Sequence, residues 1–285
     1  MTTTVFLAVI AAAIMHGAWN VLVKMNLDRF LSLFLVQVLM GFCGLAMLAA
    51  FPSPAMASVP YAIASGIIHT GYNLFLARSY KTGDLSQVYP IARGTAPLLT
   101  LIGIWLFAHE PLAPWGIAGI TILVTGIWLT TGRNGQGLRL DGTTLFFALG
   151  TSGFIGLYTV VDGLGARASG APSGYAGLVF VLDAAFLLVT GVAIRGPGII
   201  RAVLPHLKMG AAAALLSAAA YWIAIWAMTK APIPMVAALR ETSILFVIAM
   251  SALYLKEHVS LWRYAGGALI VAGAVLIRLS DYFAS

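Results

Sequence analysis

The sequence predicts an all-α membrane protein with ten transmembrane helices, arranged as two inverted repeats of five helices each. Three observations support this fold class. The chain is 61% hydrophobic and only 9% charged, whereas an ordinary soluble domain is about 25% charged. Its apolar stretches run for about 18 to 23 residues, the length that a helix needs to cross a bilayer. Finally, the second half of the chain repeats a residue pattern of the first half.

Helices, and not the strands of a closed barrel, are expected for the apolar stretches. In lipid every backbone polar group needs an internal partner, which leaves only helix bundles and closed barrels. The stretches are roughly twice as long as a barrel strand, and polar and apolar residues do not alternate along them. The ten predicted spans are 4–24, 30–51, 60–80, 85–107, 112–131, 142–162, 174–194, 209–229, 233–255 and 261–279.

The ends of the chain and the charged loops predict how these spans are oriented. No basic residue precedes the first apolar run, so we interpret it as a spanning helix and not as a cleaved signal peptide. Of the 16 Lys and Arg residues, eleven lie in loops after odd-numbered spans and three lie on the opposite side. Because basic loops stay in the cytoplasm, both termini are expected on the periplasmic side of a bacterial inner membrane.

The fourth and fifth spans resemble the ninth and tenth. The segment that begins at Tyr89 aligns without a gap on the segment that begins at Val236. The alignment superimposes Arg93 on Arg240, Glu110 on Glu257, Trp115 on Trp262, Gly119 on Gly266 and Gly126 on Gly273. Because each repeat has an odd number of helices, the two copies cross the membrane in opposite senses, as in many secondary transporters. The predicted units are a first repeat 1–131, a linker 132–141 and a second repeat 142–285.

This pattern resembles the drug/metabolite transporter superfamily, and within it the EamA-type transporters, over nearly the whole chain. The resemblance lies in HGAWNVLVK at 16–24, in AHEPL at 108–112 and LKEHV at 255–259, and in the glycine-rich last span of each repeat. It implies a carrier, often an exporter of amino acids or related metabolites, with the YddG-like amino-acid exporters as one candidate group. The HGAWN element and the paired arginines are also similar to EamA-type proteins associated with phosphonate use.

Four charged residues lie well inside the predicted spans, where ionisable groups usually face the interior of the bundle. They are Arg93, Asp183, Arg240 and Glu241, and their formal charges sum to zero. These residues could form ion pairs that hold the helices together, or they could bind a charged group of the substrate. Both roles are combined if an ion pair opens to admit substrate. A neutral sum suits a zwitterion. We expect Glu241 to reach Arg93 or the cavity, and Asp183 to pair with the other arginine.

Polar and aromatic side chains at helical spacing complete the predicted site. His16 and Asn20 share one face of the first span, and His69 and Asn73 share one face of the third. Interhelical hydrogen bonds are the alternative role for such polar pairs, and a lipid-facing or packing role is the alternative for the aromatic residues. The residues predicted to bind substrate are His16, Trp19, Asn20, His69, Tyr72, Asn73, Tyr89, Arg93, Tyr158, Trp222, Arg240 and Glu241.

Prolines in the fourth span suggest a helix that bends. Pro90 and Pro97 flank Arg93, and each removes a helix hydrogen bond, so both are predicted to serve a gate, with a static kink as the alternative. Pro232 and Pro234 open the ninth span. The glycines of the fifth and tenth spans are expected to allow close helix packing.

These patterns favour a secondary transporter that exports or exchanges small metabolites, foremost amino acids, by alternating access. An organic-anion or phosphonate transporter is the alternative, and a channel or an intramembrane enzyme is less favoured. No GxSxG, HExxH or paired carboxylate motif is present, so we expect no catalytic residue, metal or cofactor. The net charge of +7 is scattered over short loops, which argues against nucleic-acid binding. The expected partners are a small-molecule substrate and the lipid bilayer, and the expected state is a monomer or weak homodimer.

Overall fold

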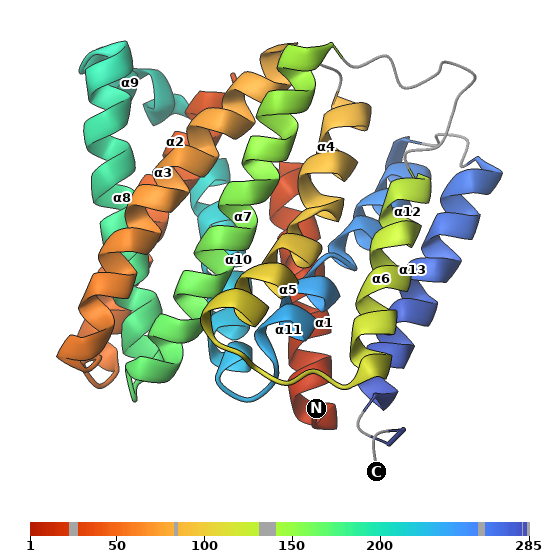
Figure 1. The fold of residues 1–285 in the computed structure, drawn as a ribbon. Helices are drawn as coiled ribbons and strands as arrows, with labels where there is room; N and C mark the ends of the chain where they lie inside the picture. The colour runs from red at the N-terminus through yellow and green to blue at the C-terminus, as the bar shows by residue number, and fades with distance from the viewer. Residues whose placement is uncertain (23–27, 83–84, 131–140, 256–259, 281, 284–285) are drawn as a thin grey trace.

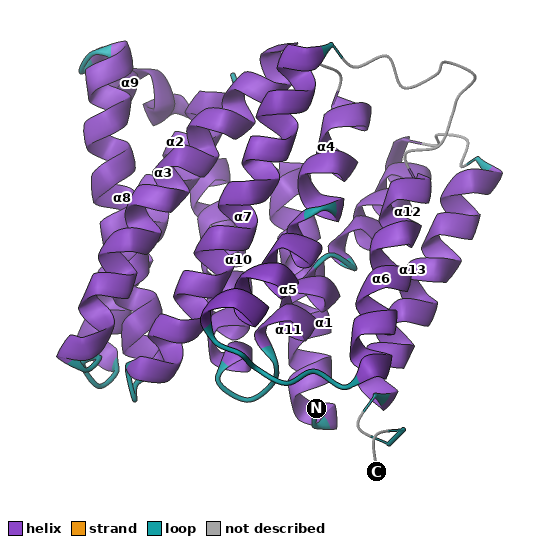
Figure 2. Ribbon diagram, viewed as in Figure 1, coloured by secondary structure: helices purple, strands orange, loops and turns teal. Residues whose placement is uncertain are grey.

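A computed structural model describes residues 1–285 except 23–27, 83–84, 131–140, 256–259, 281 and 284–285. For residues 82, 85–87, 89–90 and 250–255 it describes the backbone only. The described residues form helices and connecting loops with no strand, and the helices run side by side in one bundle (Figure 2). The predicted all-α class is confirmed.

The described part of the chain contains thirteen α-helices and two short 3₁₀ helices. Those of the first half are α1 (Thr3–Leu22), α2 (Arg29–Ala50), η1 (Met56–Ser58), α3 (Val59–Thr82), α4 (Leu85–Gly94), α5 (Ala96–Phe107) and α6 (Pro114–Thr130). Those of the second half are α7 (Gly142–Ala168), α8 (Pro172–Arg195), α9 (Gly198–Val203), η2 (Leu204–His206), α10 (Leu207–Met228), α11 (Ile233–Arg240), α12 (Ser243–Leu255) and α13 (Leu261–Leu279).

Several of these helices have the length and composition of membrane spans. Six helical stretches of the described chain are long and apolar enough to cross a bilayer. They are Thr3–Leu22, Arg29–Ala50, Gly142–Ala168, Pro172–Arg195, Gly198–Met228 and Leu261–Leu279. Two shorter apolar stretches, Ile91–Phe107 and Pro114–Thr130, lie between them in the chain. The chain is therefore a multi-span membrane protein.

The predicted fourth span, 85–107, is not one continuous helix. It is divided into α4 and α5, and the break lies at Thr95, two residues after Arg93. Pro97 explains the break, because it has no N–H for the carbonyl of Arg93 four residues earlier and its ring clashes with that carbonyl. Arg93 consequently lies in the last turn of a half-helix that ends inside the bundle.

The predicted ninth span, 233–255, is broken at the equivalent point without a proline. α11 ends at Arg240 and α12 begins at Ser243. Between them, the N–H and the hydroxyl of Thr242 both donate to the carbonyl of Leu239, at 3.1 and 2.7 Å. In an α-helix the N–H of a residue donates to the carbonyl four residues earlier. Here the acceptor is the carbonyl three residues earlier, as in a 3₁₀ helix, and this tightens the turn. Arg240, like Arg93, therefore lies at the end of a half-helix.

The two halves pack against each other in a pattern that a two-fold axis would produce. α1 packs against α10, and α3 packs against α7. Three further pairs join counterparts of the two halves, α2 with α8, α5 with α11 and α6 with α13. In Figure 1 the first half starts at the end of the bundle that carries both termini, and the second half starts at the opposite end. Inverted repeats would give this arrangement, while the repeat boundaries 1–131 and 142–285 stay a prediction.

The pair α6 and α13 makes a close backbone contact between the halves. A Cβ atom added to Gly126 would lie 2.7 Å from the carbonyl oxygen of Gly266, and one added to Gly119 would lie 3.0 Å from that of Gly273. Since real Cβ atoms do not approach so closely, larger residues would force the helices apart. The prediction that these glycines serve close packing is confirmed.

Candidate functional site

A polar cavity lies in the middle of the bundle, and both halves of the chain contribute to its walls. Its empty space, including the part that opens to solvent, is about 560 Å³. Two neighbouring hollows share Arg93 with it: one continues between α5, α7 and α11, and the other continues beside Asn20 and Tyr80. The walls of the central cavity come from α1, α2, α3, α4, α7, α8, α10 and α11.

Most of the residues predicted to bind substrate surround this cavity or the adjoining hollows. They are His16, Trp19, Asn20, His69, Tyr72, Asn73, Arg93, Tyr158, Arg240 and Glu241. Pro97, predicted to serve a gate, lines the hollow beside α5. The side chains of Tyr89 and Pro90 lie outside the described residues. The structure thus brings most of the predicted residues together around one cavity.

Trp222 does not belong to this group. Its indole Nε1 donates to the hydroxyl of Ser173 at 2.9 Å, and its ring packs against Phe51 with 5.2 Å between centroids. Adjacent residues on a helix point about 100° apart, and on α10 it is Tyr221 that lines the cavity. Trp222 is therefore not among the residues around the cavity, and its predicted role in substrate binding stays a prediction.

Arg93 forms a buried ion pair that joins the two halves. Its Nε lies 2.8 Å from the Oε2 of Glu241, and the two side chains are 7% and 5% exposed. A charge-assisted bond of this length is strong in a site from which water is largely excluded. The expected contact between Glu241 and Arg93 is confirmed, so much of the charge of Arg93 is neutralised within the protein.

Arg240 is in a different situation. It is 7% exposed and lines the cavity, yet no described residue forms an ion pair with it or accepts a hydrogen bond from it. Its Cζ lies 4.8 Å from the centre of the Tyr221 ring, a cation–π contact. The expected pairing of Asp183 with Arg240 is not found among the described residues, because Asp183 faces α3 instead.

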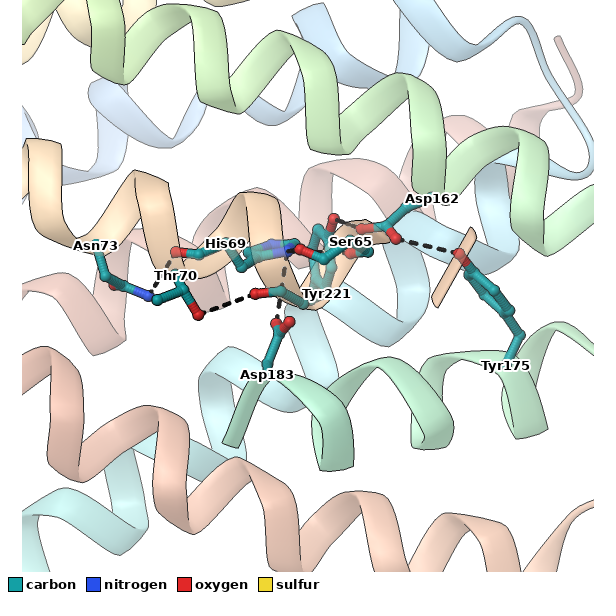
Figure 3. Close-up of polar contacts among 9 residues, drawn as sticks. Ser65, His69, Thr70, Asn73, Asp162, Tyr175, Asp183 and Tyr221 are labelled. Carbon is teal, nitrogen blue, oxygen red and sulfur yellow. Dashed lines mark hydrogen bonds and ion pairs between the residues drawn. The ribbon is translucent and has the colours of Figure 1, made fainter. Parts of the chain in front are cut away.

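Asp183 contacts His69 on α3 (Figure 3). Its Oδ2 lies 3.5 Å from the Nδ1 of His69. The His69 ring stacks on Tyr158, with 4.0 Å between centroids and 19° between planes. Asp183 is only 4% exposed, and it lines the cavity together with His69 and Gln37.

A second buried acid, Asp162, was missed by the sequence prediction. It is fully buried, and it accepts hydrogen bonds from the hydroxyls of Tyr175, at 3.2 Å, and Tyr221 (Figure 3). The predicted sixth span ended at residue 162, which placed this acid at an interface, but α7 continues to Ala168. The signal that was available is the run of small and apolar residues that follows Asp162.

Asp162 also changes the charge balance of the interior. In the part of the chain that the structure describes, the buried Arg, Asp and Glu residues are Arg93, Arg240, Asp162, Asp183 and Glu241. The four charged residues that the sequence places inside the spans sum to zero as expected, and Asp162 adds a third acid to the two arginines. Among the described residues, the interior therefore contains one more acidic side chain than arginines.

Arg167 ties three segments together at the end of the bundle that carries the termini (Figure 1). From the last turns of α7, it donates to the carbonyls of Met228 at 2.9 Å and Ala231 at 3.1 Å, and to Glu110 at 3.0 Å. We call this set of contacts the Arg167 lock. It connects the α5–α6 loop with the α10–α11 loop, which leads directly into the half-helix that carries Arg240.

Comparisons with known proteins bear on the whole chain. A model of the EamA-like transporter family matches residues 3–132 and again residues 142–279. A solved structure described only as "Crystal structure of protein" has the same fold over the full length of both chains, with a TM-score of 0.76 and 18% sequence identity. A search of curated proteins found no match.

Proposed function

Because this chain belongs to the EamA-like transporter family, we propose that it carries small metabolites with a carboxylate group, foremost amino acids, by alternating access. The family implies a membrane transporter of small molecules, and the proposal concerns what is carried and how. We place the protein in a bacterial inner membrane with periplasmic termini, as the distribution of loop charges favours.

The observation that carries the proposal is Arg240. A buried cation with no acidic partner costs at least ~2.5 kcal/mol in a membrane interior on insertion scales. A guanidinium group presents a planar fork that matches both oxygens of a carboxylate. Arg240 lines the central cavity, so a substrate carboxylate there would gain the ion pair that the described protein residues do not supply.

The remaining walls suit an organic substrate body. Tyr72, Tyr158, Tyr221 and His69 form a cluster of rings whose centroids lie between 4.0 and 6.5 Å apart. Such side chains offer an apolar face and a polar tip, which allows a site to hold both the side chain and the polar groups of a metabolite. This environment supports amino acids, including aromatic ones.

Alternating access is supported by the two broken helices. Each places an arginine at the end of a half-helix near the contact between the repeats, the usual place for a transporter site. The Arg167 lock would keep the end with the termini closed while the other end admits substrate. Breaking it, and closing the opposite end, would expose the same cavity to the other side of the membrane.

An organic anion without an amino group, such as a phosphonate, is the alternative substrate. Arg240 favours it, because a single cation is sufficient to bind an anion. Asp183 opposes it, because an anion in the cavity would lie near an acidic side chain that lines the same walls.

Counterflow in liposomes tests the proposal. Purified protein in vesicles preloaded with an unlabelled amino acid should take up the labelled compound faster than in empty vesicles, since only a carrier shows exchange stimulation. Arg201→Lys, an exposed change on α9, provides a control variant that should behave as the wild type. Exchange of a phosphonate or other organic anion without exchange of any amino acid would support the alternative, and uptake without exchange stimulation would indicate a channel.

A further inference from the structure

Two buried carboxyl groups approach α3 from opposite sides, and they differ in how well they are satisfied (Figure 3). Both oxygens of Asp162 accept a hydrogen bond from a tyrosine hydroxyl, and Asp162 does not line the cavity. The Oδ1 of Asp183 is buried and has no hydrogen-bond partner among the residues that the structure describes. Its Oδ2 is the oxygen that faces His69.

An unsatisfied carboxylate oxygen in this position is costly. Burying a polar acceptor without a partner costs about 1–3 kcal/mol, and more when the group is charged. Asp162 shows that this bundle can supply hydroxyl donors to a buried acid, because it does so with Tyr175 and Tyr221. Asp183 therefore has an oxygen to which no described residue donates, on a residue that lines the same cavity as Arg240.

We propose that Asp183 binds the amino group of the substrate, and that it decides whether the transporter accepts amino acids or amine-free carboxylates. This inference rests on the proposed function, in which Arg240 binds the carboxylate. An ammonium group carries three N–H donors, and one of them would give Oδ1 the hydrogen bond that it lacks. The site then holds a zwitterion at both ends, with a cation for its carboxylate and an acid for its amine.

A neighbouring side chain holds Asp183 in place for this role. The imidazole of His69, whose Nδ1 also lies 3.1 Å from the carbonyl of Ser65, contacts Oδ2. Gln37 lines the cavity beside the same carboxyl group. A carboxyl group held by a neighbouring side chain loses little conformational freedom when a ligand binds, so this contact favours selectivity. An amine-free carboxylate would place a second negative group in the cavity and leave Oδ1 unsatisfied.

The test compares ligands that differ only in the amino group. Binding of common amino acids and their amine-free counterparts, for example phenylalanine and 3-phenylpropanoate, is measured on the purified full-length protein by ligand-induced shifts in thermal unfolding. The best-bound pair is then used with variants. Asp183→Asn should weaken binding of the amino acid by about tenfold to a hundredfold, the effect of one hydrogen bond to a charged group. Binding of the amine-free compound should change little or improve.

Matched variants keep the outcome decisive. Asp162→Asn removes the other of the two acids beside α3 and should leave the preference between the two ligands unchanged. Asp183→Glu keeps the charge and should retain a preference for the amino acid, which guards against a folding defect in the asparagine variant. An Asp183→Asn protein that keeps the wild-type preference would overturn this inference while leaving the proposed function intact. If the wild type binds no amino acid, the proposed substrate class fails, and this inference fails with it.

Discussion

Arg93 and Arg240 occupy equivalent positions in the two halves of the molecule, yet the protein uses them differently. Each lies at the end of a half-helix and each is almost completely buried. Arg93 is paired with Glu241 at 2.8 Å, whereas Arg240 has only the face of Tyr221 among the described residues. Residues at equivalent positions in the two repeats can therefore have different electrostatic environments. Here Arg93 has a structural partner, whereas Arg240 is available to a ligand.

The difference originates in the residue that follows each arginine. Glu241 follows Arg240 but reaches across to Arg93, while the equivalent residue after Arg93 is Gly94. A side chain at Gly94 is disfavoured, because a Cβ atom there would lie 2.7 Å from the ring of Trp128. The second half thus supplies an acid to the first half and receives none at the equivalent position in return.

The largest effect that tests this comparison is expected at Arg93. Arg93→Gln should lower the free energy of unfolding by about 3–5 kcal/mol, because it leaves the buried Glu241 without its cation. Thermal or denaturant unfolding in detergent measures this loss. Adding Glu241→Gln should restore most of the stability. If the double variant is as unstable as the single one, Arg93 stabilises the fold by some other contact.

Arg240 should show the opposite behaviour. Arg240→Lys should reduce amino-acid counterflow by about tenfold to a hundredfold, since an ammonium group lacks the planar fork that holds a carboxylate. The unfolding midpoint should stay close to that of the wild type. Normal transport by Arg240→Lys together with lost transport by Arg93→Lys would reverse the roles assigned to the two arginines.

A smaller effect is expected at the Arg167 lock, which acts next to the Arg240 half-helix. The probe is a cysteine introduced as Ala237→Cys, which reacts with a thiol reagent added on the side of the termini. Arg167→Gln should increase the labelling of this cysteine by about threefold to tenfold, because the change removes three contacts of a partly exposed arginine. The background carries Cys43→Ala, because Cys43 is the single cysteine. The matched control is Arg195→Gln, which breaks the ion pair with Asp28 at the opposite end. Equal labelling in both variants would count against a lock specific to one end.

The smallest effect concerns the cause of the two helix breaks. Pro97→Ala restores an N–H that can bond the carbonyl of Arg93, so it should straighten the α4–α5 break and reduce transport a few-fold. Stability should change by less than about 1 kcal/mol. Thr242→Val provides the counterpart in the second half, where the hydroxyl bonds Leu239. Unchanged counterflow in both variants would show that the breaks are static features without a role in gating.

The parts of the fold that could be predicted depend on local pattern. Apolar length and low charge predicted the helical membrane class, and the register of Gly119 and Gly126 with Gly266 and Gly273 predicted a close helix contact. The break at Thr242 was missed because no proline indicates it, and it arises from a hydroxyl that bonds the backbone. Asp162 was missed because the predicted span ended at that residue, although the helix continues.

The sequence by itself determined that this chain folds in lipid as helices, that Arg93 and Arg240 are equivalent, and that buried charges need partners. These conclusions follow from composition, spacing and the cost of burying charge, which act along the chain. Only the tertiary structure decided which acid serves which arginine, since Arg93 and Glu241 are 148 positions apart. The rotation and packing of α8 turn Asp183 toward His69 and away from Arg240, and local spacing contains no information about that rotation.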